Sequence, residues 1–200
     1  MIKAIFFDVG GVIIEEKFRQ GVMQYEKEFN IPMGEFYKIV HDHQGWIDFT
    51  LGKISEKEYL RFCENSKKGY IFNKNRYIEL LEEFMKPNIE VVNYIKFLSK
   101  SYIIGIISNN PKEWFDRFIT KAKLENEIKI KAVSGYVHIR KPDKKIFQIA
   151  LNQTNAKPRE SIYVDDRSDR IYGAKKIGMN IIIFDGDVAR LKKEIKKFNY

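Results

Sequence analysis

The feature that most constrains the fold is a short apolar run at the start of the chain that ends in a carboxylate. Ile2 to Phe7 are apolar apart from Lys3, and isoleucine and phenylalanine favour β-strands. A run this short and apolar is typical of a strand buried on both faces, as in a parallel sheet. Asp8 follows directly, so its carboxylate would lie in the crevice where open α/β sheets bind ligands. A strand that ends in a simple turn gives the same pattern, so this stretch alone leaves both interpretations open.

The second part of the chain alternates apolar strands with helical patterns. We expect four further strands, at residues 102–107, 128–133, 161–164 and 181–184. The strand at 128–133 should be half exposed, because Lys129 and Lys131 alternate with its apolar residues. Pro142 is placed to occupy the first turn of one helix, and Gly178 to end another. Strands that alternate with helices imply βαβ units, and therefore an α/β fold with a parallel sheet.

Residues 15–86 have a different pattern of apolar residues, which indicates helices and no convincing buried strand. Ser55 and Glu58 form a capping-box pattern that marks the start of a helix. The residues after it that we expect to face inward are Tyr59, Leu60 and Phe62. We therefore predict a small helical bundle at residues 15–86, inserted into a core made of residues 1–14 and 87–200.

Composition narrows the class of protein and its partners. Apolar residues make up 44% of the 200 residues and charged residues 32%, which suits a packed core rather than a disordered chain. The net charge is +9, but the lysines are scattered, which favours a solvated basic surface over a nucleic-acid groove. Cys63 is the only cysteine, and no apolar run approaches the ~20 residues of a membrane span. We expect a cytoplasmic protein with no nucleic-acid or membrane partner.

Polar groups gather at the predicted strand ends. They are Asp8, Ser108-Asn109 and Asp165-Asp166, and Lys141 precedes a helix. Parallel strands put their carboxyl ends on the same edge of the sheet, so these groups could converge. Neighbouring carboxylates repel each other unless a cation joins them, and Mg²⁺ prefers a few carboxylates plus phosphate oxygens. Taken singly, each group also fits a helix cap, a turn or a solvated lysine.

Four motifs in this order resemble those of the haloacid dehalogenase-like (HAD) hydrolase superfamily, over essentially the whole length. They are Phe7-Asp8-Val9-Gly10-Gly11-Val12, Ile106-Ile107-Ser108-Asn109, Arg140-Lys141-Pro142-Asp143 and Val164-Asp165-Asp166. The resemblance implies a Rossmann-like core, and residues 15–86 are similar to the helical cap of the family. The stretch from Trp46 to Tyr59 most resembles the branch of sugar-phosphate phosphatases and epoxide-hydrolase N-terminal domains.

The resemblance also implies roles for individual residues. Asp8 would be the nucleophile that forms an aspartyl-phosphate, with Lys141 beside it. Mg²⁺ would be held by Asp8, the Gly10 carbonyl and Asp166, while Asp165 would orient Lys141 or support the metal. The expected substrate-binding residues are Ser108, Asn109, Gly10, Gly11 and Trp46, although Trp46 also fits the apolar core of the cap.

Two residues depart from the family pattern. Gly10 stands where phosphatases of the family usually carry a second aspartate, the general acid and base. Arg170 stands where the family often has asparagine or aspartate, and Asp169 is a candidate replacement in a shifted register. General acid–base help is worth ~10²–10⁴ in rate, so we expect slow turnover or a restriction to good leaving groups.

Three functions fit these motifs. The leading hypothesis is a Mg²⁺-dependent phosphatase of a small phosphorylated metabolite. The alternatives are a 2-haloacid dehalogenase, whose halide leaving group needs no proton, and a non-catalytic binding or regulatory protein that kept the fold. His41-Asp42-His43 is interpreted as a surface segment of the cap, because residues two apart on a helix do not face one ion.

Overall fold

The computed structural model describes residues 1–66 and 69–198, and its centre is a parallel sheet of five strands in the order β3-β2-β1-β4-β5. The strands are β1 (Ala4–Phe7), β2 (Ile103–Ser108), β3 (Ile128–Val133), β4 (Ser161–Asp165) and β5 (Asn180–Ile183). All five strands expected from the sequence are present. Because β1 is central and pairs with both β2 and β4, the ends of these three strands lie next to one another.

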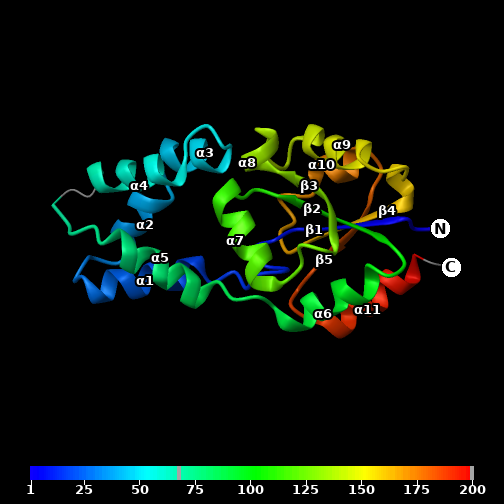
Figure 1. Ribbon diagram of the computed structural model, residues 1–200, viewed down its shortest axis with the longest axis horizontal. Coiled ribbons are helices and arrows are strands. Elements are labelled where there is room, and N and C mark those ends of the chain that lie inside the picture. Colours follow the sequence, from blue (N-terminus) through cyan, green and yellow to red (C-terminus); the bar gives the residue numbers. More distant parts are fainter. Residues whose placement is uncertain (67–68, 199–200) are drawn as a thin grey trace.

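Helices cover both faces of this sheet (Figure 1). One face carries α6 (Ile89–Leu98), α7 (Lys112–Ala122) and α11 (Val188–Lys197), and the other α9 (Lys144–Asn152) and α10 (Tyr172–Lys176). Short α8 (Ser134–Val137) follows β3, and a 3₁₀ turn at Pro158–Glu160 precedes β4. Side chains of β1 alternate between the two layers, with Ile5 and Phe7 in one apolar cluster and Ala4 and Phe6 in the other. Burial on both faces explains why β1 reads as a continuous apolar run.

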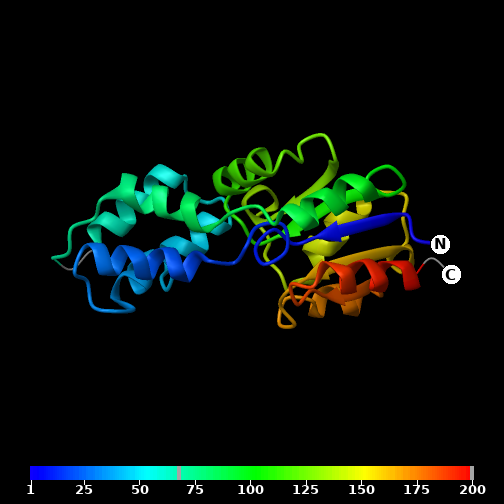
Figure 2. The same cartoon turned by 90° about the horizontal axis from the view of Figure 1, so that it is seen from below.

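The segment between β1 and α6 forms a group of helices beyond the carboxyl ends of the strands (Figure 2). These are α1 (Phe18–Glu28), α2 (Glu35–Val40), α3 (Gln44–Thr50), α4 (Glu56–Asn65) and α5 (Lys74–Phe84). The described part of this segment contains no strand that belongs to the sheet. The expected capping box at the start of α4 is present, because Ser55 and Glu58 exchange hydrogen bonds.

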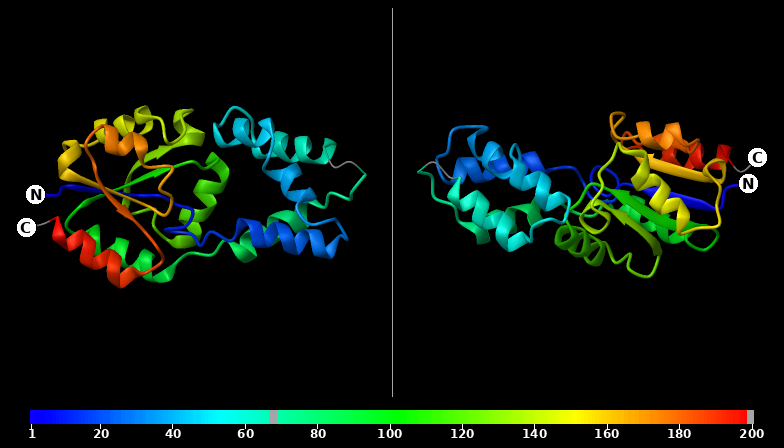
Figure 3. Two further views of the ribbon diagram at one scale, coloured as in Figure 1. Left: turned by 180° about the vertical axis from the view of Figure 1, so that it is seen from behind. Right: turned by 90° about the horizontal axis from the view of Figure 1, so that it is seen from above.

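Two chain segments connect the helical group to the sheet, and they run side by side (Figure 3). The Glu15 amide donates to the Lys86 carbonyl at 2.9 Å, and the Asn88 amide to the Ile13 carbonyl at 2.8 Å. A second contact joins α4 to α7, where Glu56 accepts from the Trp114 indole at 2.7 Å. These contacts place the helical group over the sheet edge where β1, β2 and β4 end.

Two expectations about local structure are wrong. Pro142 is not in the first turn of α9, because Asp143 is the N-cap and its carboxylate accepts from the Lys145 amide. Phe62 does not face the interior, since it is 39% exposed and stacks on the ring of His43. Pro142 lies one residue before the N-cap of α9, and Phe62 lies on the outer face of α4, so the type of a residue alone is a weak guide to its exact place at a helix end or on a helix face.

None of the helices in the described parts of the chain is long and apolar enough to cross a membrane.

Candidate functional site

Asp8 lies directly after β1, and neighbouring groups hold both of its carboxylate oxygens. Oδ1 accepts from the Val9 amide at 2.7 Å and from the Ser108 hydroxyl at 2.6 Å. Oδ2 lies 2.7 Å from the Lys141 ammonium. Burial raises the pKa of Asp8, Lys141 opposes this effect, and the negative charge of Asp165 adds to it. A buried carboxylate with few contacts to water and a fixed orientation is well prepared to act as a nucleophile.

The Lys141 ammonium is buried and donates to three acceptors. Besides Asp8, these are Asp165 Oδ2 and the Tyr163 hydroxyl, each at 2.8 Å. Tyr163 in turn makes a short hydrogen bond to Asp165. Burial, together with the charges of Asp8 and Asp165, holds the pKa of Tyr163 well above its usual range, so the hydroxyl keeps its proton. The three partners use all three ammonium protons and fix the lysine beside Asp8.

Asp165 is engaged on both oxygens. Oδ2 is held by Lys141 and Tyr163, and Oδ1 accepts from the Arg167 amide at 2.8 Å. The sequence left two roles open for this residue, orienting the lysine or supporting a metal. The contacts favour the first role, because neither oxygen is left without a protein partner.

Asp166 differs from Asp165 in that part of its carboxylate is unpaired. Its Oδ1 is buried and has no hydrogen-bond partner among the described residues. Burial, followed by the charges of Asp8 and Asp165, raises the pKa of Asp166 to about 7. Gly11 permits this position, because its φ is +75° and a Cβ there would lie 2.2 Å from the Asp166 carboxyl carbon.

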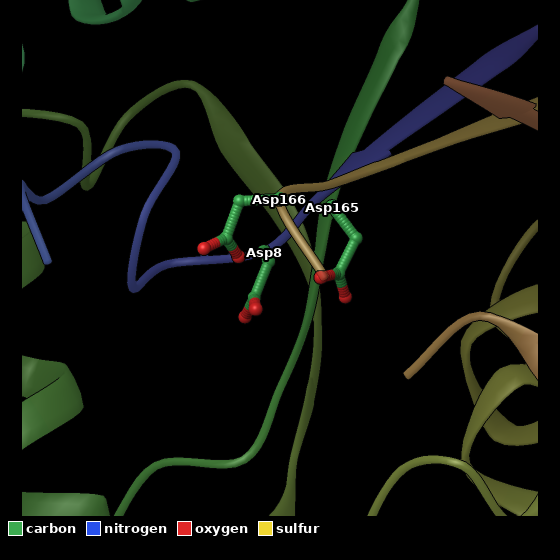
Figure 4. Close-up of side chains that lie close together, drawn as sticks. All are labelled: Asp8, Asp165 and Asp166. Atoms are coloured by element: carbon green, nitrogen blue, oxygen red, sulfur yellow. The ribbon is translucent and has the colours of Figure 1, made fainter. Parts of the chain in front are cut away.

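Three carboxylates therefore meet at one place (Figure 4). Asp8, Asp165 and Asp166 each offer an oxygen within 4.8 Å of the others. The unpaired Asp166 oxygen and the raised pKa values of Asp8 and Asp166 are what a missing cation would produce. All of the donors are hard oxygens, so the set fits Mg²⁺, with Asp8 and Asp166 as the residues that would hold it, together with the Gly10 carbonyl that the family resemblance implies.

The polar residues after β2 support this site in a way that the sequence did not indicate. The Asn109 side chain accepts from the Lys141 amide at 2.7 Å and donates to the Lys141 carbonyl at 3.1 Å. We expected the Asn109 amide to bind phosphate; its side chain has a further role, because it holds the main chain of Lys141 in place. Ser108 is in the expected position. Its hydroxyl donates to Asp8 and accepts from the side-chain amide of Asn110 at 2.8 Å.

A cavity of about 780 Å³ opens above these groups and is shared by the sheet edge and the helical group. Trp46 lines it, as expected, and contacts the rings of Phe18 and Trp114, with centroids at 5.8 and 5.4 Å. His41-Asp42-His43 also lines the cavity, and Asp42 is exposed, as expected of a surface segment of the helical group. Only the helical spacing assumed for it is wrong. The chain is not helical there: α2 ends at Val40, and His43 caps α3.

Arginines line one side of the cavity. Arg140 and Arg170 lie close enough that their like charges, together with burial, lower the pKa of Arg140. No acidic partner of Arg140 is found within residues 1–66 and 69–198. Asp169 does not replace the expected family residue, because it lies on the surface and pairs with Arg167 at 3.0 Å.

Sequence reasoning missed three residues of this site. Tyr163 and Asn110 hold Lys141 and Ser108, and Glu16 lines the cavity on the side of Asp8. Burial by surrounding protein and the charge of Asp8 raise the pKa of Glu16, although its side chain is open to the cavity. None of the three is marked by a local pattern, although Glu16 lies eight positions after the nucleophile in a connecting segment.

Fold and site together define an α/β protein with an aspartate nucleophile candidate at the end of its central strand and an inserted group of helices. The family model described as haloacid dehalogenase-like hydrolase matches residues 5–184. The chain therefore belongs to the haloacid dehalogenase-like hydrolase family, as its four motifs indicated.

Several relatives in this family have been characterised. The chain is 38% identical over 220 residues to a glyceraldehyde 3-phosphate phosphatase of Pyrococcus furiosus, which covers 98% of this chain and 87% of the relative. It is 26% identical to a D-ribitol-5-phosphate phosphatase of Bacteroides thetaiotaomicron, with 89% of each protein covered. Among solved structures, a HAD family enzyme of Bacteroides thetaiotaomicron in complex with magnesium and inorganic phosphate superposes with a TM-score of 0.78 at 17% identity, covering 96% of this chain and 99% of that one. At this identity the structural likeness supports the fold alone.

Proposed function

We propose that this protein is a Mg²⁺-dependent phosphatase that hydrolyses a small phosphorylated metabolite through an aspartyl-phosphate on Asp8. One observation carries the proposal. The Asp8 carboxylate is held beside a lysine and a serine, while a second carboxylate, that of Asp166, keeps an unpaired oxygen next to it. We also propose that residues 15–86 act as a cap domain over a core of residues 1–14 and 87–200.

The residues of the site would have the following roles in hydrolysis of the phosphate ester. The Asp8 carboxylate attacks phosphorus, the bond to the leaving oxygen breaks, and water then hydrolyses the aspartyl-phosphate. The positive charge of Lys141 would attract the phosphoryl oxygens to Asp8, Ser108 would exchange its bond to Asp8 for one to the phosphoryl group, and Asp165 keeps the lysine in place. Mg²⁺, held by Asp8, Asp166 and the Gly10 carbonyl, would supply charge neutralisation at the phosphoryl group.

A small sugar phosphate is the substrate class that we favour. Relatives of this chain are named as phosphatases of glyceraldehyde 3-phosphate and D-ribitol-5-phosphate. The cavity, at about 780 Å³, has room for such a molecule, and its aromatic wall at Trp46 and Phe18 can pack against a carbon chain. The cap would select the leaving group and exclude water during transfer.

The test is hydrolysis of p-nitrophenyl phosphate and of a panel of sugar phosphates, with and without Mg²⁺. Asp8→Asn should abolish turnover while circular dichroism shows a folded protein. Asp185→Asn makes the same chemical change at an exposed ion pair with Arg190 and should turn over like the wild type. Unchanged activity in Asp8→Asn would refute the proposal.

The other two hypotheses predict different results in activity and binding assays. A stretch of 87 residues, 44% of this chain, is 29% identical to an (S)-2-haloacid dehalogenase of Burkholderia cepacia. Halide release from 2-chloropropionate without Mg²⁺ would favour dehalogenation. Binding of phosphate and Mg²⁺ without turnover of any ester would favour a non-catalytic role. The unpaired Asp166 oxygen favours the phosphatase, since attack at carbon needs no cation there.

A further inference from the structure

The loop after β1 folds back on itself and returns the chain to the nucleophile. The Ile14 amide donates to the Val9 carbonyl, and the Gly11 amide to the Ile14 carbonyl, both at 2.8 Å. This closed loop brings Glu16 over Gly10. A Cβ placed on Gly10 would lie 2.8 Å from Glu16 Oε2, closer than real Cβ contacts. The Glu16 carboxylate therefore occupies the space that a side chain at position 10 would fill.

The two glutamates of this connection are in different environments. Glu15 forms an ion pair with Lys17 outside the cavity. Glu16 lines the cavity together with Asp8 and Asp166, and its charge interacts with both of them. Its carboxylate lies close enough to the Phe18 amide, at the start of α1, for that amide to oppose the rise in the pKa of Glu16. Of the two neighbours, Glu16 alone is placed to reach a group bound at Asp8.

Hydrolysis of a phosphate ester of an ordinary alcohol needs a proton on the leaving oxygen, because an alkoxide is a poor leaving group. It also needs a base to take a proton from the attacking water. Gly10 can supply neither, although it stands where the family usually has an aspartate.

We propose that Glu16 is a catalytic residue and makes both proton transfers, an inference that rests on the proposed phosphatase function. When the Asp8 oxygen bonds to phosphorus and the phosphorus–oxygen bond to the leaving group breaks, the Glu16 carboxyl gives its proton to the leaving oxygen. When water attacks the aspartyl-phosphate, the Glu16 carboxylate takes a proton from that water, and the bond between Asp8 and phosphorus breaks. Glycine at position 10 then leaves room for the Glu16 carboxylate, because a Cβ there would displace it.

Leaving-group dependence separates this role from a structural one. We would measure kcat/KM for aryl phosphates of decreasing leaving-group acidity and for an alkyl phosphate, in the wild type and in Glu16→Gln. Loss of the acid should lower kcat/KM for the alkyl ester by ~10²-fold or more and change it little for p-nitrophenyl phosphate. With p-nitrophenyl phosphate, rapid mixing should show a burst of p-nitrophenol, because hydrolysis of the aspartyl-phosphate has lost its base. The same loss for every ester, with no burst, would overturn the proposal.

A rescue experiment uses the shared space at position 10. Gly10→Asp in a Glu16→Ala background should restore a large part of the activity on the alkyl ester, because the new carboxyl takes the vacated position. Gly10→Asp alone should be less active than this double variant, since the new side chain and the Glu16 carboxylate compete for the same space. A double variant no better than Glu16→Ala would contradict the proposal.

Two controls complete the design. Glu15→Gln changes the adjacent glutamate, whose carboxylate is paired with Lys17, and should hydrolyse both classes of ester like the wild type. Mg²⁺ affinity, measured by isothermal titration calorimetry, should be the same in Glu16→Gln and the wild type. A marked loss of affinity would make Glu16 a metal-site residue and overturn the proton-transfer role.

If the wild type hydrolyses no phosphate ester, the proposed function has failed. If the wild type hydrolyses such an ester and Glu16→Gln is equally active, only this inference has failed.

Discussion

Replacing Asp166 with asparagine should stabilise the protein in the absence of Mg²⁺. The pKa of Asp166 rises from 3.8 to about 7 on folding, because burial and the charges of Asp8 and Asp165 disfavour its ionised form. Between these two values the unfolded chain is ionised and the folded protein is protonated. The free energy of unfolding therefore falls as the pH rises from about 4 to about 7, and the full loss of stability is present above pH 7. Asparagine does not ionise, so this loss of stability is absent at every pH.

The size of this gain follows from the pKa difference. A change from 3.8 to about 7 corresponds to ~4 kcal/mol if the site were fully shielded from water. Asp166 is partly exposed, so solvent screening reduces the effect, and we expect a gain of about 1–2 kcal/mol in the free energy of unfolding at about pH 8. The gain should shrink towards zero as the pH approaches 4.

Urea denaturation followed by circular dichroism measures this difference, first with a chelator and then with millimolar Mg²⁺. The metal should stabilise the wild type by RT ln(1 + [Mg²⁺]/Kd) and leave Asp166→Asn almost unchanged, so the order of stabilities reverses. Asp169→Asn is a control, because Arg167 lowers the pKa of Asp169 and its removal brings no stabilisation. Without Mg²⁺ at about pH 8, an Asp166→Asn variant less stable than the wild type would refute the reasoning.

Three further predictions concern the surroundings of the nucleophile. Tyr163→Phe removes one of the three acceptors of the Lys141 ammonium and should lower the free energy of unfolding by about 1–3 kcal/mol in urea titrations; an unchanged midpoint would contradict this. Gly11→Ala places a Cβ 2.2 Å from the Asp166 carboxyl carbon, so Mg²⁺ affinity measured by calorimetry should fall about tenfold or more, an energy of ~1.4 kcal/mol. Arg140→Ala removes a cavity cation with no acidic partner in the described chain, so steady-state kinetics should show a KM raised about tenfold; an unaltered KM would exclude Arg140 from substrate binding.

The fold and the charged centre of the site were predictable because their signals are local. An apolar run that ends in a polar group marks a buried strand, and parallel pairing brings such ends together without further information. This rule places Asp8 beside Ser108, and Asp165 and Asp166 next to them. The capping box at Ser55 was equally local, because its two partners are three residues apart.

The residues that sequence reasoning missed depend on contacts between distant segments. Tyr163 lies inside β4, where an aromatic residue suggests core packing, and its hydroxyl meets Lys141 only through the three-dimensional arrangement of the strands. Glu16 looks like Glu15 in the sequence, and only the closed loop at Ile14 directs it to the cavity. The contacts of the Asn109 side chain were equally hidden, because they join two residues that lie 32 positions apart in the chain.

The account depends on Asp8 as the group that becomes phosphorylated, and its most direct test is mass spectrometry of the enzyme quenched in acid during turnover. With a hydrolysed phosphate ester and Mg²⁺ present, the peptide that contains Asp8 should carry the added mass of one phosphoryl group, located on that residue by fragmentation. The modification should be absent from Asp8→Asn. Turnover with a phosphoryl group on another residue, or with none trapped on Asp8 under single-turnover conditions, would contradict the account.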